Sequence, residues 1–124
     1  MDAENSDHLM TLRALLRQFA ADRNWEQFHT PRNLLLALVG EVGELAELFQ
    51  WVSDEQAAVI MTDPDLGARI GEELADVFGY VVRLADILGI DLYAALMAKV
   101  KLNAERYPVD LARGKATKYT ELHD

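Results

Sequence analysis

The sequence of 124 residues contains no cysteine, so it has no disulfide framework and gives no sign of an oxidising compartment. It also has no apolar run near the roughly 18 residues that a membrane-spanning helix needs. Its first residues, MDAENSDH, are acidic and polar, unlike a secretory signal peptide. From these absences we expect a soluble protein of the cytoplasm.

Basic residues are scarce as well. The chain carries 12 lysines and arginines against 21 aspartates and glutamates, which gives a net charge of -9 at pH 7. Such a charge opposes binding to nucleic acid, for which a basic surface would be expected. It also means that an anionic ligand would need bound cations. The chain has no glycine-rich phosphate-binding loop either.

Helical patterns account for most of the chain, and no segment shows the alternation of a β-strand. Helices are predicted at about 7–22, 31–51, 54–61, 65–88 and 92–107. Thr30 before Pro31 is a typical helix start, Ser53 and Asp91 can cap two further helices, and Gly89 suits a helix end. The predicted fold is all-α, a four- to five-helix bundle in one domain over residues 1–124, with residues 1–6 and about 110–124 flexible.

The helix predicted at 65–88 has an unusually wide apolar arc. Its apolar residues cover roughly half of its circumference or more, too much for one face of a small bundle. We therefore predict a homo-oligomer, either a dimer or a tetramer. The arginines of the first helix are expected to be solvated, namely Arg13, Arg17 and Arg23.

Two pairs of acidic residues lie inside the two most apolar helical segments. Glu41 and Glu44 are three residues apart, as are Glu73 and Asp76, so each pair offers two carboxylates on one helix face, about 60° apart. Helical projection places Glu41 and Asp76 at the edge of the core, where a carboxylate is unfavourable unless it is paired or holds a cation. Four carboxylates without histidine or cysteine suit a hard divalent cation. Glu47 lies about 120° from Glu41 and is expected to be exposed or to support the site from outside.

Other interpretations of these acids carry less weight. A single pair of this kind is usually a solvated helix face, but two pairs against apolar neighbours are harder to explain in that way. A di-iron carboxylate bundle needs Glu-x-x-His motifs, and no histidine follows these glutamates at that spacing. A helical interaction module without enzyme activity would explain the wide apolar arc but would leave the acids without a purpose.

The sequence resembles the all-α nucleoside triphosphate pyrophosphatases, the MazG-like superfamily. Its signature is Glu-x-x-Glu, then 28 residues, then Glu-x-x-Asp, as found here from Glu41 to Asp76. Over a wider range, the sequence resembles the dCTP pyrophosphatase branch of this superfamily. The resembling segments are residues 24–29 (NWEQFH), 31–51, 106–108 (RYP), 111–113 (LAR) and 118–122 (KYTEL).

The resemblance implies hydrolysis of dCTP and its 5-modified forms to the nucleoside monophosphate and pyrophosphate. It also implies that Mg²⁺ is the cofactor, held by the catalytic carboxylates Glu41, Glu44, Glu73 and Asp76. A broader specificity for nucleoside triphosphates stays an alternative. In the relatives that this chain most resembles, a histidine stands where this sequence has Leu16, so we expect looser selectivity for the base here.

Further residues are candidates for binding the nucleotide. Aromatic rings can enclose a pyrimidine base, and the resemblance favours Trp25 as a wall of the base pocket. Three polar residues of the last helix share one face, and the resemblance favours contact between Asn103 and the ligand over a hydrogen bond to another helix. The basic tail could fold over a triphosphate. The candidate set is Trp25, Trp51, Tyr80, Lys99, Asn103, Arg106 and Lys118.

Overall fold

The computed structural model describes the backbone of residues 2–122 and the side chains of residues 8–122. Within that part the chain is helical and contains no strand, so the all-α prediction is confirmed. The helices are α1 (Asp2–Asp22), α2 (Pro31–Glu47), α3 (Asp54–Ala58), α4 (Pro64–Leu88), α5 (Leu92–Arg106) and α6 (Val109–Ala112). Three short 3₁₀ turns lie between or after them, η1 (Glu26–Phe28), η2 (Ile60–Thr62) and η3 (Tyr119–Glu121).

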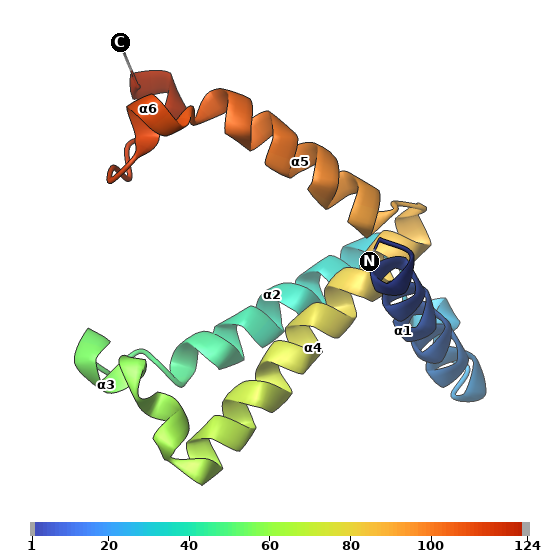
Figure 1. The fold of residues 1–124 in the computed structure, drawn as a ribbon. Coiled ribbons are helices and arrows are strands. Elements are labelled where there is room, and N and C mark those ends of the chain that lie inside the picture. Colours follow the sequence, from blue (N-terminus) through green and yellow to red (C-terminus); the bar gives the residue numbers. More distant parts are fainter. Residues whose placement is uncertain (1, 123–124) are drawn as a thin grey trace. The chain divides into compact units, whose positions relative to one another are not determined.

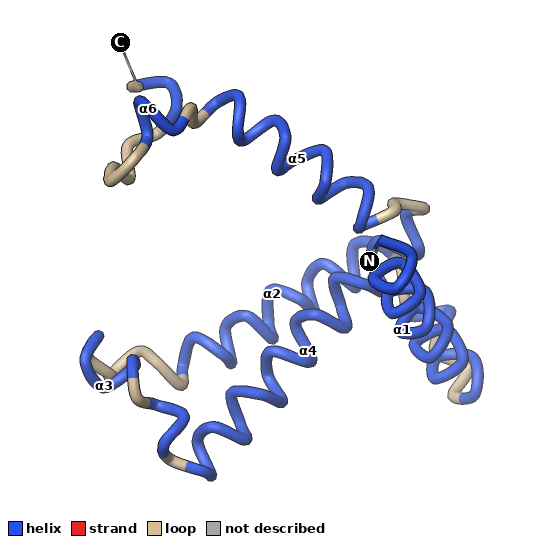
Figure 2. The backbone as a smooth tube through the Cα atoms, in the orientation of Figure 1, coloured by secondary structure: helices blue, strands red, loops and turns tan. Residues whose placement is uncertain are grey.

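The chain divides into two compact units, Met1–Ile90 and Asp91–Asp124, each of which is described by itself. In the first unit α2 and α4 pack side by side, and the chain reverses between them through α3 and η2 (Figures 1 and 2). Both α1 and η2 also pack against α4. The longest helix therefore organises this unit, because every other major element contacts it. The prediction of a single domain with flexible ends stays a prediction, and residues 1, 123 and 124 lie outside the described part.

Side-chain caps mark the starts of α2, α3, α4 and α5. A cap accepts hydrogen bonds from backbone N–H groups that have no partner within the helix. The caps are Thr30 for α2, Ser53 for α3, Asp63 for α4 and Asp91 for α5, which confirms the three helix starts predicted above. At the other end of α4, Gly89 adopts φ 72°, a left-handed conformation that favours glycine.

Three predicted boundaries were wrong. The first helix begins at Asp2 and not near residue 7, because the apolar spacing used to place it says nothing about polar residues that continue the helix. The second ends at Glu47 and not near residue 51. Its last turn tightens, since the N–H of Leu48 bonds the carbonyl of Leu45, and Ser53 already caps the next helix. The third helix, predicted to reach residue 61, ends at Ala58, because Val59 leaves the helical conformation and the separate turn η2 begins at Ile60.

The core of the first unit is small. Its buried apolar residues are Ala20, Leu34, Ile70, Val82 and Ala85. Next to this core, Gly67 allows η2 to approach α4 closely, because a Cβ at this position would lie 3.1 Å from Cε of Met61.

Large apolar side chains remain exposed on both packed helices. On α2 they include Leu36 (54%) and Val39 (61%), and on α4 they include Leu74 and Phe78. Isolated apolar residues are normal on a protein surface, but several on neighbouring turns indicate a face that another element covers. Among the described helices, none combines the length and the hydropathy required to cross a membrane.

Candidate metal centre

The packing of α2 along α4 brings three of the four predicted carboxylates together. One oxygen each from Glu41, Glu73 and Asp76 can be chosen so that all three oxygens lie within 4.8 Å of one another. Glu41 comes from α2 and the other two come from successive turns of α4. Glu41 and Glu73 are half-buried and Asp76 is exposed, so the cluster opens to solvent on one side.

Two oxygens of this cluster are left without partners. Oε2 of Glu41 and Oε2 of Glu73 are both buried and accept no hydrogen bond from the described residues. A buried polar atom without a partner is rare and unfavourable, because it has lost its water and gained nothing. Two carboxylate oxygens can relieve each other only if they share a proton or a cation.

In the metal-free protein, the surroundings of Glu41 favour a shared proton. The pKa of Glu41 is raised from 4.5 to about 7, first by burial, then by hydrogen bonding to Glu73 and to Glu44, and then by the negative charges of Glu44 and Asp76. These hydrogen bonds require that Glu41 be protonated, which agrees with the missing partner of its ionised form. A cation bound to the cluster would displace this proton.

The residues present fit a divalent metal. Three converging carboxylates offer hard oxygen ligands from two helices, and the partnerless oxygens face a position that a cation would satisfy. The cluster is thus a candidate site for a divalent cation. Water or a phosphate oxygen would have to supply the remaining ligands, as is common for small divalent ions.

Glu44 lies beside this cluster but not within it. Its carboxylate is exposed, and it is near enough to Glu41 to raise the pKa of that group. The predicted role of Glu44 as a fourth ligand therefore stays a prediction. Glu47, one further turn along α2, is exposed, as expected.

The aromatic candidates lie at different places along α2 and α4. Tyr80 is half-buried one turn after Asp76, on the same face of α4. Trp25 precedes α2 and is 43% exposed, whereas Trp51 follows α2 and is 88% exposed. Because α2 has 17 residues, it spans about 25 Å. The two tryptophans of one chain lie beyond opposite ends of α2.

The polar candidates belong to the second unit. On α5, Lys99, Asn103 and Arg106 follow at spacings of four and three residues, which puts them on one face, and Lys99 and Asn103 are exposed. The tail folds back within this unit. Tyr119 packs edge-on against Tyr107, and the guanidinium of Arg106 lies 4.7 Å from the centre of the Tyr119 ring. Lys118, directly before Tyr119, is exposed.

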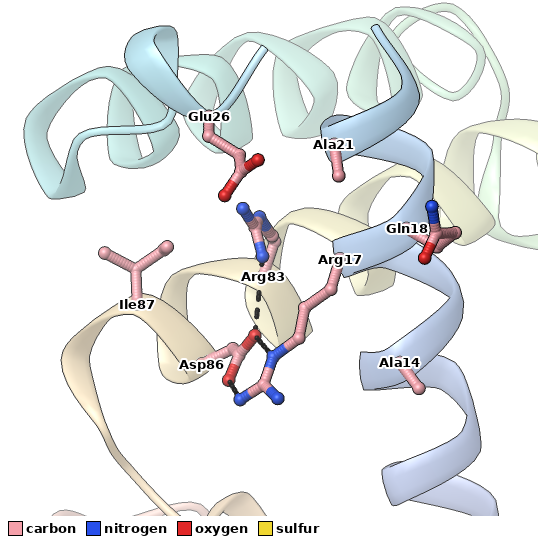
Figure 3. Close-up of a pocket in the computed structure, with 8 residues that line it drawn as sticks. All are labelled: Ala14, Arg17, Gln18, Ala21, Glu26, Arg83, Asp86 and Ile87. Atoms are coloured by element: carbon pink, nitrogen blue, oxygen red, sulfur yellow. Dashed lines mark hydrogen bonds and ion pairs between the residues drawn. The ribbon is translucent and has the colours of Figure 1, made fainter. Parts of the chain in front are cut away.

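Sequence reasoning missed an ionic cluster at the junction of α1, η1 and α4 (Figure 3). Arg17 was expected to be solvated but donates two hydrogen bonds to Asp86, at 2.7 and 2.6 Å. Arg83 is 6% exposed and donates to His29. The signal that could have revealed the cluster is Arg83 itself, a charged residue within the apolar sequence VVRLA.

The comparisons with known proteins agree with this architecture. The chain matches the MazG-like family over residues 37–122, which include all four candidate metal ligands. The match covers more than half of the chain, and the chain belongs to this family. The resemblance inferred from the acidic signature is therefore confirmed.

The chain is also similar to individual members. It is 55% identical to dCTP pyrophosphatase 1 of Rattus norvegicus and 54% identical to that of Homo sapiens, with 92% of this chain and 67% of each relative aligned. The structure resembles the crystal structure of a pyrophosphatase from Archaeoglobus fulgidus. There the TM-score is 0.73 at 37% identity, covering 82% of this chain and 93% of the other.

The raised pKa of Glu41 predicts how pH affects the metal-free protein. The native state keeps a proton on Glu41 that the unfolded chain releases, so the free energy of unfolding should fall as pH rises from 4.5 to about 7. Urea denaturation in a chelator at several pH values measures this slope. Glu41→Gln should flatten it, whereas Glu47→Gln, an exposed neighbour on α2, should leave it unchanged. The same slope in Glu41→Gln as in the parent protein would contradict the assignment.

Proposed function

We propose that this chain is a Mg²⁺-dependent nucleoside triphosphate pyrophosphatase of the cytoplasm that hydrolyses dCTP and 5-modified dCTP to the monophosphate and pyrophosphate. The observation that carries the proposal is the Glu41, Glu73 and Asp76 cluster with its two partnerless oxygens. The family and the 55% identity to a dCTP pyrophosphatase support the reaction and the substrate.

The carboxylates of the site would have different roles in this reaction. Glu41, Glu73 and Asp76 would hold the ion from two helices, α2 and α4. Mg²⁺ bound there would neutralise phosphate charge, orient the phosphates and lower the pKa of the attacking water. Glu44 is exposed next to the cluster, so its carboxylate can complete the ligand set or accept the proton of that water.

Basic side chains are needed because the body of the protein is acidic. With a net charge of -9, phosphates would be repelled without local cations. We assign this role to Lys99, Arg106 and Lys118 of the second unit, with Asn103 as a hydrogen-bonding residue on the same face of α5 as Lys99 and Arg106. Arginine and lysine both suit phosphate, arginine through its two parallel donors.

The base would be enclosed by Trp25, Trp51 and Tyr80. Aromatic faces read the shape of a pyrimidine and its 5-substituent. Since Trp25 and Trp51 lie beyond opposite ends of α2, about 25 Å in length, both can wall one pocket only if they come from two copies of the chain. The proposed pocket therefore needs a homo-oligomer, a dimer or a tetramer, and the exposed apolar face of α2 supports this assembly.

A broader specificity for nucleoside triphosphates is the main alternative. Leu16 is half-buried on α1, where the resembling relatives have a histidine, so it offers no hydrogen bond to a base. Sites that bond a substrate discriminate more strongly than apolar walls. We therefore expect dCTP to be preferred over dTTP and dUTP by a modest ratio. A non-enzymatic helical module would leave the partnerless carboxylates unexplained, and the acidic surface argues against nucleic acid as a partner.

The first test is hydrolysis of a panel of nucleotides with and without Mg²⁺. We expect pyrophosphate release from dCTP that requires Mg²⁺ and is lost, by about a thousandfold or more, in Glu41→Ala, Glu73→Ala and Asp76→Ala, since each removes a ligand of the ion on which the chemistry depends. Glu44→Ala should also lose turnover.

Glu47→Ala is the matched control, an acid on the same helix that lies outside the cluster, and it should keep the parent rate. Circular dichroism confirms that each variant is folded. Near-normal rates at saturating Mg²⁺ in any two of the four ligand variants would refute the site. Equal rates with all nucleoside triphosphates would favour the broader enzyme.

The second test concerns assembly. We expect a homo-oligomer by sedimentation at micromolar concentration, because the apolar face of α2 stays exposed in the first unit. Leu36→Glu together with Val39→Glu should dissociate it by placing charges in that face. Arg69→Glu, a charge change at an exposed position of α4, should not. A monomeric parent protein would refute the shared pocket.

A further inference from the structure

Arg83 is a buried cation on α4, the helix that also carries Glu73 and Asp76. It lies seven residues, or two turns, after Asp76, and its exposure is only 6%. Its Nε donates a hydrogen bond of 3.1 Å to Nδ1 of His29, and its Nη1 donates one of 3.4 Å to Asp86. A buried guanidinium is tolerated only when its donors and its charge are matched.

Asp86 supplies the matching charge and is itself held in place. Arg17 of α1 grips it through two parallel hydrogen bonds, and this interaction lowers the pKa of Asp86. The Asp86 side chain is 5% exposed, so its geometry is fixed by these partners. With Asp86 fixed as the acceptor for Nη1, Nε of Arg83 is directed at His29.

The hydrogen bond to His29 reaches across the fold to the connection between α1 and α2. This connection, residues 23–30, carries Trp25 and the η1 turn. Backbone hydrogen bonds also tie it to its neighbours, for example from the N–H of Trp25 to the carbonyl of Ala20, at 2.9 Å. Asn33 of α2 donates to the carbonyl of Phe28, and Arg23 and Trp25 contact Phe19 of α1. Within residues 8–122, the hydrogen bond from Arg83 to His29 is the side-chain hydrogen bond that joins this connection to α4.

Trp25 depends on the position of this connection. Its ring packs edge-on against Phe19, with the centroids 5.7 Å apart, and is otherwise 43% exposed. Only the three residues of η1 separate Trp25 from His29. The hollow beside them, about 510 Å³ between α1, η1 and α4 (Figure 3), leaves room for the connection to move if the bond to Arg83 is lost.

We propose that Arg83 is a positioning residue that fastens His29, and with it Trp25, to the helix that carries Glu73 and Asp76, and that protonation of His29 releases this fastening. The inference rests on the proposed function in so far as Trp25 walls the base pocket. Arg83 then sets the affinity for the base and does not act on the reacting phosphate.

The pH dependence follows from the direction of the hydrogen bond. Nδ1 of His29 accepts from Arg83, so His29 is neutral with its proton on Nε2. Protonation of Nδ1 would remove the acceptor and set one cation against another. The charged groups that face His29 are Arg83 of α4, with Asp86, Arg17 and Arg13 behind it, and Glu26 of η1.

These surroundings favour the neutral form of His29. Burial lowers its pKa from 6.5, and the charge of Arg83 lowers it further, whereas Glu26 acts in the opposite direction. A group whose pKa is lowered in the folded state contributes stability above its ordinary pKa and loses it as pH falls through the folded value. The fastening is therefore complete at neutral pH and is lost at acidic pH.

Steady-state kinetics with dCTP at saturating Mg²⁺ test the role of Arg83. Arg83→Met keeps most of the side-chain volume but removes the hydrogen bonds to His29 and Asp86. It should raise KM by about tenfold or more, because fewer molecules hold Trp25 in place. The value of kcat should change less than about twofold. Arg69→Met is the matched control, because it makes the same change at an exposed arginine of α4 outside this cluster, and its KM should equal that of the parent.

His29→Gln tests the titration separately. A glutamine oxygen can accept from Arg83 but does not ionise, so KM at neutral pH should be retained and the rise of KM below pH 6.5 that we expect in the parent should disappear. Equal KM in Arg83→Met and Arg69→Met would overturn the proposal. So would the same acidic rise of KM in His29→Gln as in the parent.

A second readout does not depend on the proposed function. In a Trp51→Phe background, Trp25 is the remaining tryptophan, and acrylamide quenching reports how exposed it is. Quenching should increase in Arg83→Met at neutral pH and in the parent protein at acidic pH, but not in Arg69→Met. A failure to hydrolyse dCTP would refute the proposed function. The increased quenching would still support the positioning of Trp25 by Arg83. Unchanged quenching in Arg83→Met would overturn the inference even in an active enzyme.

Discussion

The structure of the first unit depends on how the repulsion among carboxylates is relieved where α2 packs on α4. Glu41 and Glu73 each carry a buried oxygen without a partner, and Asp76 completes a triad whose oxygens fit within 4.8 Å. Such an arrangement opposes the packing of these helices, because ionised carboxylates without water repel each other strongly. A proton on Glu41 relieves part of the repulsion, and a divalent cation, with two positive charges, would relieve more of it. The apolar contacts between the helices hold the site ready for the ion.

Local sequence signals fix the phase of the two helices and so decide which side chains meet. The caps at Thr30 and Asp63 start α2 and α4 at defined residues, with proline as the first residue of each helix. From these starts the helical repeat alone places Glu41 and Glu73 toward the partner helix and leaves Glu47 exposed. Gly67 then brings η2 close to α4, which holds the reversal between the two helices. The site is therefore a consequence of helix phase and does not require an irregular loop.

The sequence predicted what depends on local order and missed what depends on distant contacts. Helix caps, helical segments and the acidic pairs each depend on residues a few positions apart in the sequence. The family resemblance based on the signature around Glu41 is confirmed by the comparisons. The end of α2 was misplaced because the tight last turn near Leu48 has no strong sequence signal. The network of Arg83 joins residues 54 positions apart, and that of Arg17 joins residues 69 apart. No periodicity within a helix can reveal such pairs. The separation of Trp25 and Trp51 became evident only when the length of α2 was known.

The relation between the proton on Glu41 and the bound cation is the central claim, and calorimetry tests it most directly. Titration of Mg²⁺ into the protein at pH 7, in two buffers of different ionisation enthalpy, measures the protons released on binding. With the pKa of Glu41 at about 7, we predict release of about half a proton per site, and none in Glu41→Gln. Binding of Mg²⁺ without proton release in the parent protein, or equal release in Glu41→Gln, would contradict the claim that the ion replaces a shared proton at this cluster.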